Sequence, residues 1–206
     1  MKFFHVGDLH LGKQLHGYDL IKDQEHMLEE LLSYIKKEQP DAVLIAGDIY
    51  DRAVPSGTAM QLLEQFFIQA DELAKEQKAV EIILIAGNHD AAKRLQYGSS
   101  FMKRHHIHIA VMPPKQEDAY LEQVTLTDQE GVVHFYLLPY TKPGMIRHWV
   151  EQEELANTQD AVKFLLEREQ IDWNERNVLL SHQFYLHTNE DTVLCDSETP
   201  SFSVGG

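Results

Sequence analysis

The sequence contains only one cysteine, Cys195, among 206 residues. A single thiol cannot form a disulfide bond within the chain, so we expect a fold without disulfides, which suits a reducing cytoplasm. Long apolar runs are also missing, because every one is shorter than ten residues, whereas a membrane-spanning helix needs about 20. The chain reaches Asp8 without a small-residue cleavage site, which argues against a signal peptide. These absences favour a cytoplasmic protein with no membrane anchor.

Positive charge is scarce, with 18 Lys and Arg residues against 33 Asp and Glu residues and a formal net charge of −15. A protein that grips nucleic acid by itself normally carries a basic face, so this composition disfavours DNA binding by the chain alone. Two routes remain open: bound divalent cations can reverse the local field, and a separate basic partner can hold the substrate. Acidity can also simply keep a protein in solution.

The first half of the chain alternates between strand and helix patterns. Short apolar runs predict strands, and apolar residues spaced three and four apart predict helices. The expected strands are Lys2–Val6, Ala42–Ala46 and Val80–Ala86, and the expected helices run from about Leu20 to Pro40 and from Pro55 to Leu73. We place Gln24 on the inward stripe of the first helix, and Met60 and Leu63 on that of the second. Strands that alternate with helices predict a parallel sheet in an α/β fold.

The second half mixes strands with one helix. Ile107–Met112 is a predicted strand, and the segments "EQVTLT" and "VVHFYLL" flank "DQEG" as a hairpin. Asn157 or Thr158 can cap a helix that runs to about Gln170. Asn177–Phe184 is a further strand that ends on polar residues. The sequence contains no repeat and no clear interdomain linker, so we expect one domain.

Three predicted strands end alike, with a glycine followed by a side chain that carries an oxygen: Gly7-Asp8, Gly47-Asp48 and Gly87-Asn88. The carboxyl ends of neighbouring parallel strands lie on one edge of a sheet, where α/β proteins bind ligands. Glycine permits a sharp turn and leaves room beside the next side chain. The candidate cluster at this edge consists of Asp8, His10, Asp48, Asn88, His89 and His182.

Carboxylate, amide and imidazole donors occur together in this cluster, a mixture that suits Mn²⁺, Fe or Zn²⁺ better than Ca²⁺. Asp48 ends the central strand and is the natural bridge between two metals about 3.5–4 Å apart. Asn88 adds an oxygen without negative charge, which helps a site that must accept a phosphate. Each residue alone has a plainer interpretation, since Asp and Gly-Asn are common in turns. Their joint occurrence on one edge is what favours a metal site.

Four short motifs resemble those of a known family. The segments "DLHLG", "GDIYD" and "GNHD" resemble the D-x-H, G-D-x-x-D and G-N-H-[DE] blocks of calcineurin-like metallophosphoesterases, and "LLSHQF" is similar to a later single-histidine block. Within that superfamily, "HVGDLHLGKQLHG", "GDIYDRAVPS" and "LLPYTKP" are similar to the SbcD-type nuclease subunits. The resemblance covers essentially the whole chain. It implies a layered α/β/β/α sandwich with mixed sheets, truncated before its last strands.

The resemblance also implies a role for each motif residue. The implied ligands of two Mn²⁺ ions are Asp8 and His10 for the first metal, Asp48 for both, and Asn88 and His182 for the second. His89 would be the catalytic residue, which stabilises the transition state or protonates the leaving oxygen. Asp51 and Asp90 are expected to orient these groups from behind. Arg52 and His16 are candidates for contacts with the substrate.

One part of the family pattern is missing. The family completes its site with a G-H-x-H block that supplies one more histidine to each metal, and no such block follows His182 in this sequence. The capping and partner-binding regions of longer members are missing too. We therefore expect residues 1–206 to be a metallophosphoesterase domain that is incomplete at its C-terminus. Such a chain alone should bind metal weakly and have little or no nuclease activity.

The implied activity is Mn²⁺-dependent hydrolysis of DNA phosphodiesters. The resemblance implies that the enzyme acts as an exonuclease on double strands and as an endonuclease on single strands or hairpins. Its implied roles are in DNA repair, recombination and replication. The implied partners are DNA, an SbcC-type ATPase subunit and a second copy of the chain in a homodimer. One alternative is a phosphoesterase for small phosphoesters or phosphoproteins, with Arg52 on the phosphate. Another is a non-catalytic scaffold for DNA ends. The basic run "KRHHIH" is either a solvated helix end or a contact to the DNA backbone.

Overall fold

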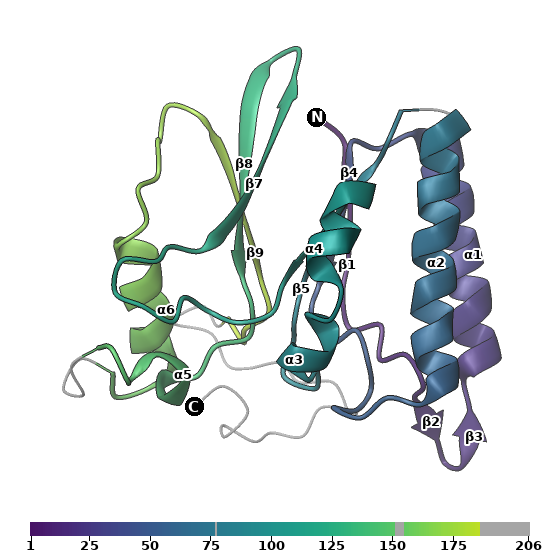
Figure 1. The fold of residues 1–206 in the computed structure, drawn as a ribbon, viewed down its shortest axis with the longest axis horizontal. Coiled ribbons are helices and arrows are strands. Elements are labelled where there is room, and N and C mark those ends of the chain that lie inside the picture. The colour runs from purple at the N-terminus through teal and green to yellow at the C-terminus, as the bar shows by residue number, and fades with distance from the viewer. Residues whose placement is uncertain (77, 151–154, 186–206) are drawn as a thin grey trace. The chain divides into compact units, whose positions relative to one another are not determined.

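The computed structural model describes residues 1–76, 78–150 and 155–185 of the chain (Figure 1). The chain forms two compact units. Of the described residues, the first comprises those within 1–112, 122–140 and 171–182, and the second comprises those within 113–121, 141–170 and 183–185. Every residue predicted for the site therefore belongs to the first unit.

The first unit is built on a parallel sheet with the strand order β1-β4-β5-β6. Its strands are β1 (Phe3–Val6), β4 (Ala42–Ala46), β5 (Glu81–Ile85) and β6 (Ile107–Ala110). All neighbouring strands are parallel, so their carboxyl ends lie at one edge, which confirms the predicted arrangement. The two central strands are apolar along nearly their whole length because both faces of the sheet are covered.

Two long helices, α1 (Ile21–Glu38) and α2 (Gly57–Glu76), lie side by side along one face of this sheet (Figure 1). Their apolar stripes join that face in a core that includes Leu28, Ile35 and Phe66. None of the helices in the described part of the chain is long and apolar enough to cross a membrane.

The ends of these helices follow the local sequence. The backbone N–H of Ala59 donates to Ser56 Oγ at 3.1 Å, which caps the start of α2. Gln39 adopts a left-handed conformation directly before Pro40, which ends α1 as predicted. One detail of the prediction is wrong, because Met60 is 48% exposed. The small side chain of Ala59 takes the buried place on that turn instead.

A second sheet covers the other face of the parallel sheet. It consists of β7 (Glu122–Asp128) and β8 (Gly131–Leu138), which are antiparallel, and β9 (Arg176–Ser181), which is parallel to β8. Buried residues of both sheets pack together in a second core that includes Leu44, Ile83, Phe135 and Leu180. The expected layered α/β fold with a mixed sheet is therefore confirmed.

Several very short elements were not predicted from the sequence. A hairpin of β2 (Gln14–Leu15) and β3 (Tyr18–Asp19) follows β1. The helices α3 (Ala92–Leu95) and α4 (Ser99–Met102) and the 3₁₀ helix η1 (Lys103–His105) follow β5. Elements of two to four residues carry too few side chains for a periodic pattern to be visible.

The second unit contains α5 (Pro143–Ile146) and α6 (Thr158–Glu167). The backbone N–H of Asp160 donates to the side chain of Asn157 at 3.0 Å, and the backbone N–H of Asn157 donates to the Asp160 carboxylate at 3.3 Å. This capping box identifies Asn157 as the N-cap of the two residues proposed. The helix ends at Glu167, three residues earlier than expected.

Asp128 links the ends of the second sheet. Arg176, at the start of β9, donates from Nη1 and Nη2 to the two carboxylate oxygens of Asp128 at 3.1 and 2.6 Å. The Arg176 guanidinium holds the pKa of the Asp128 carboxyl far below its usual value. Because folding lowers this pKa, the ionised carboxylate stabilises the fold above its unfolded pKa of about 3.9. That contribution is lost as the pH falls through the folded pKa.

We expect Asp128→Asn to lower the melting temperature at neutral pH, and the difference from the unchanged chain to shrink as the pH falls below about 4. Melting curves followed by circular dichroism over this range test it. Glu130→Gln is the matched control, since it removes the same charge from the same hairpin while leaving the Asp128–Arg176 pair intact. An equal loss for both variants at every pH would contradict the role assigned to Asp128.

Candidate metal centre

The loops that follow β1 and β4 run side by side at the carboxyl edge of the parallel sheet. The backbone N–H of Asp8 donates to Gly47 O at 3.1 Å, and that of His10 donates to Asp48 O at 2.9 Å. Asp8, His10 and Asp48 have φ angles of 53°, 43° and 48°. This left-handed conformation is uncommon outside glycine and tends to occur at functional sites. The strained backbone here coincides with three of the predicted ligands.

Asp48 lies at the centre of the cluster, and only 3% of the residue is exposed. Nε2 of His10 and Nε2 of His89 lie 3.7 and 3.9 Å from Asp48 Oδ2. Nε2 of His182 lies 3.6 Å from the other carboxylate oxygen, Oδ1. Imidazoles therefore face both oxygens of one buried carboxylate.

Two sets of side chains share Asp48, and each could hold one cation: His10, Asp48 and His89 form one set, and Asp8, Asp48 and His182 form the other. Asn88 belongs beside the second set, because its Oδ1 lies 3.1 Å from His182 Nε2. Asp8 Oδ1 also lies 3.7 Å from His10 Nε2, as the resemblance implies for the first metal. All six side chains of the predicted cluster are thus brought together.

The spacing of these atoms fits a shared cation. Separations of 3.6–3.9 Å between the imidazole nitrogens and Asp48 are too long for hydrogen bonds. A cation with bonds of about 2.0–2.2 Å to each ligand spans such gaps. In addition, His10 Nδ1 is buried and has no hydrogen-bond partner in the described part of the chain. Asp51 Oδ1, the neighbouring acceptor, is 3.7 Å away from it.

His182 is held in the orientation that a metal ligand needs. Its Nδ1 donates to the backbone carbonyl of Ala46 at 2.7 Å. This hydrogen bond leaves Nε2 to face Asp48 and Asn88. Metal-binding histidines commonly donate their second ring N–H to a carbonyl or carboxylate in the same way, which sets the tautomer.

The pKa shifts of Asp48 and His182 are also those expected of a candidate cation site. Burial by itself would raise the pKa of Asp48, but the nearby His182 and the backbone N–H of His89 outweigh it and lower that pKa. Burial would lower the pKa of His182, but the Asp48 carboxylate and the Ala46 carbonyl raise it. Imidazolium and carboxylate therefore stabilise each other, and a cation that binds here competes with protonation of His182.

Two glycines make room for these side chains. A Cβ atom at Gly87 would lie 2.1 Å from Asp48 Oδ1 and 2.2 Å from Asp48 N. A Cβ atom at Gly47 would lie 2.4 Å from Nδ1 of His182, and the φ of Gly47 is +84°. The glycine at each strand end is therefore required by the close approach of neighbouring loops.

His89 lies at the open side of the cluster, with 44% of its side chain exposed. Its Nδ1 donates to the backbone carbonyl of Asp51 at 2.8 Å, and its ring meets that of His10 edge-on at a centroid distance of 4.9 Å. Nε2 is consequently the atom presented to the cluster. The geometry alone is compatible with either a ligand or a catalytic role for this atom.

Asp90 and Gln24 support the cluster from behind. The Asp90 carboxylate accepts the backbone N–H groups of Ile49, Tyr50 and Gly87 at 2.9–3.1 Å, so it ties the β4 loop to the β5 loop. Burial raises the pKa of Asp90 despite these bonds. Asp90 was expected to orient His89 or a ligand, and its observed contacts are with the backbone of the two loops that carry the cluster.

Gln24 was assigned from the sequence only to the apolar stripe of α1. Its buried side chain donates to Leu9 O and His10 O at 3.1 and 2.8 Å and accepts from the backbone N–H of Gly12 at 2.9 Å. It therefore fixes the loop that carries His10. A polar residue among the apolar positions of a helix was the available signal for this role.

The sequence model of the calcineurin-like phosphoesterase family matches residues 1–200. The chain belongs to the calcineurin-like phosphoesterase family. Among curated proteins it is 33% identical over 202 residues to the SbcD subunit of the nuclease SbcCD from Staphylococcus epidermidis, and 32% identical to that from Staphylococcus saprophyticus. Each match covers 97% of this chain and 50% of the relative. The phosphoesterase chain thus spans about half the length of these relatives.

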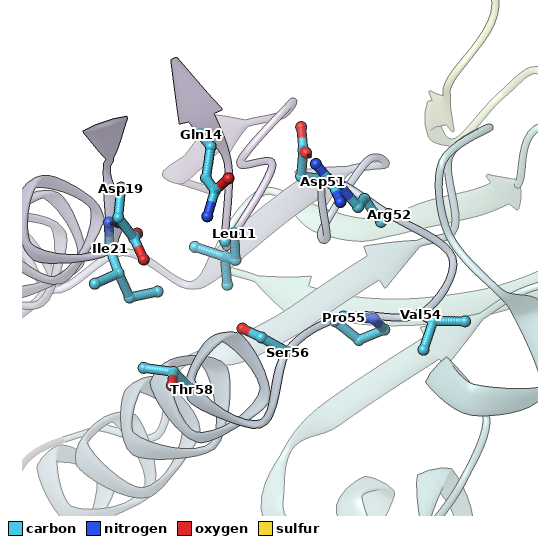
Figure 2. A pocket seen from close by; sticks show the side chains of 11 residues that line it. Leu11, Gln14, Asp19, Ile21, Asp51, Arg52, Val54, Pro55, Ser56 and Thr58 are labelled. Atoms are coloured by element: carbon cyan, nitrogen blue, oxygen red, sulfur yellow. Dashed lines mark hydrogen bonds and ion pairs between the residues drawn. The ribbon is translucent and has the colours of Figure 1, made fainter. Parts of the chain in front are cut away.

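A pocket of about 300 Å³ is lined in part by Asp51, whose Oδ1 lies 3.7 Å from Nδ1 of His10 in the cluster. Figure 2 shows Arg52 next to Asp51 at one end of this pocket, and Arg52 Nε lies 3.6 Å from Asp51 Oδ2. The guanidinium of Arg52 is largely exposed. His16, the other predicted substrate contact, lies exposed in the turn of the β2–β3 hairpin with a φ of 50°. No hydrogen bond joins it to the cluster among the described residues.

We expect Gly87→Ala to weaken Mn²⁺ binding by roughly 10- to 100-fold, because the added methyl group displaces Asp48. Isothermal titration calorimetry measures the affinity. Gly57→Ala is the matched control, since a Cβ atom there meets no neighbour within 4 Å. Unchanged Mn²⁺ affinity in a folded Gly87→Ala protein would show that Asp48 is not a metal ligand.

Proposed function

We propose that this phosphoesterase chain is the catalytic part of an SbcCD-type nuclease, which hydrolyses DNA phosphodiesters with two divalent cations such as Mn²⁺. The observation that carries the proposal is the buried Asp48 carboxylate, which two sets of potential ligands share. A carboxylate between two cations is the arrangement that phosphatases and nucleases use for phosphoryl transfer.

The residues that would hold the first cation are Asp8, His10 and Asp48, and those for the second are Asp48, Asn88 and His182. When bound, the cations supply Lewis acidity and neutralise charge that develops on the phosphate. Asn88 contributes an oxygen without negative charge, so the protein ligands do not cancel the positive charge that attracts a phosphodiester. The backbone bonds of Asp90 keep the two loops from separating under the repulsion between these ligands.

His89 is the proposed catalytic residue. Its Nδ1–H is held by the Asp51 carbonyl, so Nε2 can carry a second proton toward the open side of the cluster. An imidazolium there stabilises negative charge on the phosphate oxygens or gives its proton to the leaving oxygen. Asp51 would act through its backbone carbonyl and Arg52 through its exposed guanidinium, as groups that position His89 and the phosphate.

The proposed partners follow from the charge of the chain and from its relatives. A chain with a net charge of −15 needs help to hold a polyanion. The name of the staphylococcal relatives places them in a two-component nuclease, and we infer that an SbcC-type ATPase and a second copy of this chain share the grip on DNA. The proposed role is in DNA repair, recombination and replication.

We expect His89→Ala to abolish most hydrolysis, by about 10²- to 10⁴-fold, with Mn²⁺ affinity retained. Asp48→Asn should instead lose Mn²⁺ binding and hydrolysis together. The assay uses the chain within its full-length protein and partner complex, with hairpin DNA as substrate and calorimetry for the metal. Loss of metal binding in His89→Ala would make His89 a ligand. Cleavage that is equally absent from the unchanged protein and from both variants would favour the non-catalytic DNA-end scaffold.

A second candidate function is hydrolysis of small phosphoesters or phosphoproteins. The observation in its favour is Arg52, whose exposed guanidinium stands at the pocket beside the cluster, where it can bind a terminal phosphate. Parallel assays of hairpin DNA and a chromogenic diester separate the candidates. Rapid turnover of the small diester without DNA cleavage would favour the second.

We further propose that the 206-residue chain alone binds Mn²⁺ weakly and cleaves DNA slowly, because the G-H-x-H histidines of the family pattern do not follow His182 in it. Calorimetric titration with Mn²⁺ should give an affinity well below that of a longer family member that carries the block. Two tightly bound Mn²⁺ ions per chain together with rapid cleavage would contradict this.

A further inference from the structure

The segment that follows the metal cluster differs in charge from the rest of the chain. Residues 91–116 contain no Asp or Glu, although the whole chain has 33. Its cations include Lys93 and Arg94 in α3 and Lys103 and Arg104 in η1. The basic run "KRHHIH" is thus part of a longer acid-free segment.

This segment is anchored to the core rather than loose. Leu95 is buried, and Ala92 and Met102 pack against the core cluster that lies under α1 and α2. The short helices α3 and α4 follow each other directly, and Gly98 with a φ of +77° makes the turn between them (Figure 1). The backbone therefore presents the remaining side chains of the segment outward in a defined order.

Two aromatic side chains point outward between the cations. Tyr97 is 86% exposed and Phe101 is 66% exposed. Phe101 touches only one other ring, that of His105, at a centroid distance of 5.0 Å in the described residues. Together with Lys93, Arg94, Lys103 and Arg104 these two residues form what we call the basic–aromatic segment.

Nearby carboxylates bind the histidines of this region and leave the cations available. Asp71 lies 3.1 Å from His105, and Glu81 lies 2.7 Å from His106 and 2.8 Å from His108. In contrast, none of the four cations has a carboxylate within 4 Å in the described part of the chain. Lys103 acts on the Glu122 carboxyl at longer range: burial raises the pKa of Glu122, and the positive charge of Lys103 offsets part of that rise.

We propose that the basic–aromatic segment binds a single strand of nucleic acid, with bases stacked on Tyr97 and Phe101 and phosphates on the flanking cations. Aromatic rings that alternate with basic side chains are how proteins hold single strands without sequence preference. A duplex offers no free base faces to such rings, because its bases are stacked on each other. A single strand of nucleic acid is therefore the partner that matches both the exposed rings and the positive charge.

The position of the segment links it to the proposed cleavage site. Lys93 follows His89 by four residues, which places their Cα atoms at most about 14 Å apart. A strand that lies on the segment would therefore lead into the metal centre. In this respect the inference rests on the proposed function, since it assigns the side from which single-stranded substrate reaches His89.

The test measures binding of a fluorescein-labelled oligothymidylate of about 12 nucleotides to the 206-residue chain by fluorescence anisotropy. EDTA is present throughout, so neither metal nor hydrolysis contributes. We expect measurable binding at about 50 mM salt that weakens steeply toward about 200 mM, and weaker binding of a blunt duplex of the same length. Absence of oligothymidylate binding by the unchanged chain would overturn the inference.

Aromatic variants test the stacking. We expect Tyr97→Ala and Phe101→Leu each to weaken binding at least about fivefold, and Tyr97→Phe to keep it, because stacking needs a ring but no hydroxyl. Trp173→Ala is the matched control, since Trp173 is 81% exposed and lies outside the segment. Circular dichroism checks that each variant is folded. Equal affinity for Tyr97→Ala and the unchanged chain would overturn the inference.

Charge variants test the binding of phosphates. The double change Lys93→Ala and Arg94→Ala should reduce the slope of log affinity against log salt by about 0.7 for each phosphate that the protein no longer neutralises. Lys36→Ala with Lys37→Ala, at the exposed end of α1, is the control and should leave the slope unchanged. An unchanged slope for the first pair would contradict the proposal.

Failure here and failure of the proposed function are distinguishable. The binding assay contains EDTA, so its outcome does not depend on Asp48 or His89. If the protein cleaves DNA with Mn²⁺ but Tyr97→Ala leaves oligothymidylate binding unchanged, the proposed function stands and this inference is wrong. If Tyr97→Ala instead weakens association with an SbcC-type ATPase and leaves oligothymidylate binding intact, the segment is a protein interface and the inference is wrong.

Discussion

The candidate site depends on one buried charge, the carboxylate of Asp48 at the end of the central strand. A buried carboxylate is costly unless opposite charge surrounds it. Here imidazoles face both of its oxygens, and bound cations would complete the compensation. The surrounding features serve this arrangement: Gly87 leaves room for the carboxylate, and Asp90 ties together the two loops that approach it. Because the parallel strands end at one edge, loops that are forty residues apart in sequence meet around a single atom group.

Because the proposed substrate is a polyanion, this acidic chain must confine its positive charge to the places where that substrate would lie. The metal centre is one such place, since two cations at the sheet edge would reverse the local field. The basic–aromatic segment is the other, because it carries no acid in a chain with a net charge of −15. The loop after β5 supplies Asn88 and His89 to the candidate metal centre and then leads into α3, where the basic–aromatic segment begins. The proposed catalytic residue and the proposed strand-binding residues therefore lie close together in the sequence.

Periodicity and turn chemistry predicted most of the fold. The four strands that are apolar or nearly so were placed within a residue or two of their observed bounds, and the parallel order followed from their alternation with helices. Met60 was assigned inward because the apolar pattern of a helix does not show which of two adjacent apolar residues packs against the sheet. In the structure Ala59 is buried and Met60 is 48% exposed. The β2–β3 hairpin was missed because two-residue strands have no period. Gln24 was read as part of an apolar stripe because its partners are backbone atoms of a distant loop.

By itself, the sequence determined the types of candidate ligand, their place after successive strands, and the family to which the phosphoesterase chain belongs. Those follow from local composition, since a glycine and an oxygen donor at each strand end can be read without coordinates. Tertiary structure alone decided which nitrogen of each histidine faces Asp48, and that His182 is set by the carbonyl of Ala46. It also decided that Tyr97 and Phe101 stay outside the core. Each of these features depends on distances between segments that are far apart in the sequence, and only the folded backbone sets such distances.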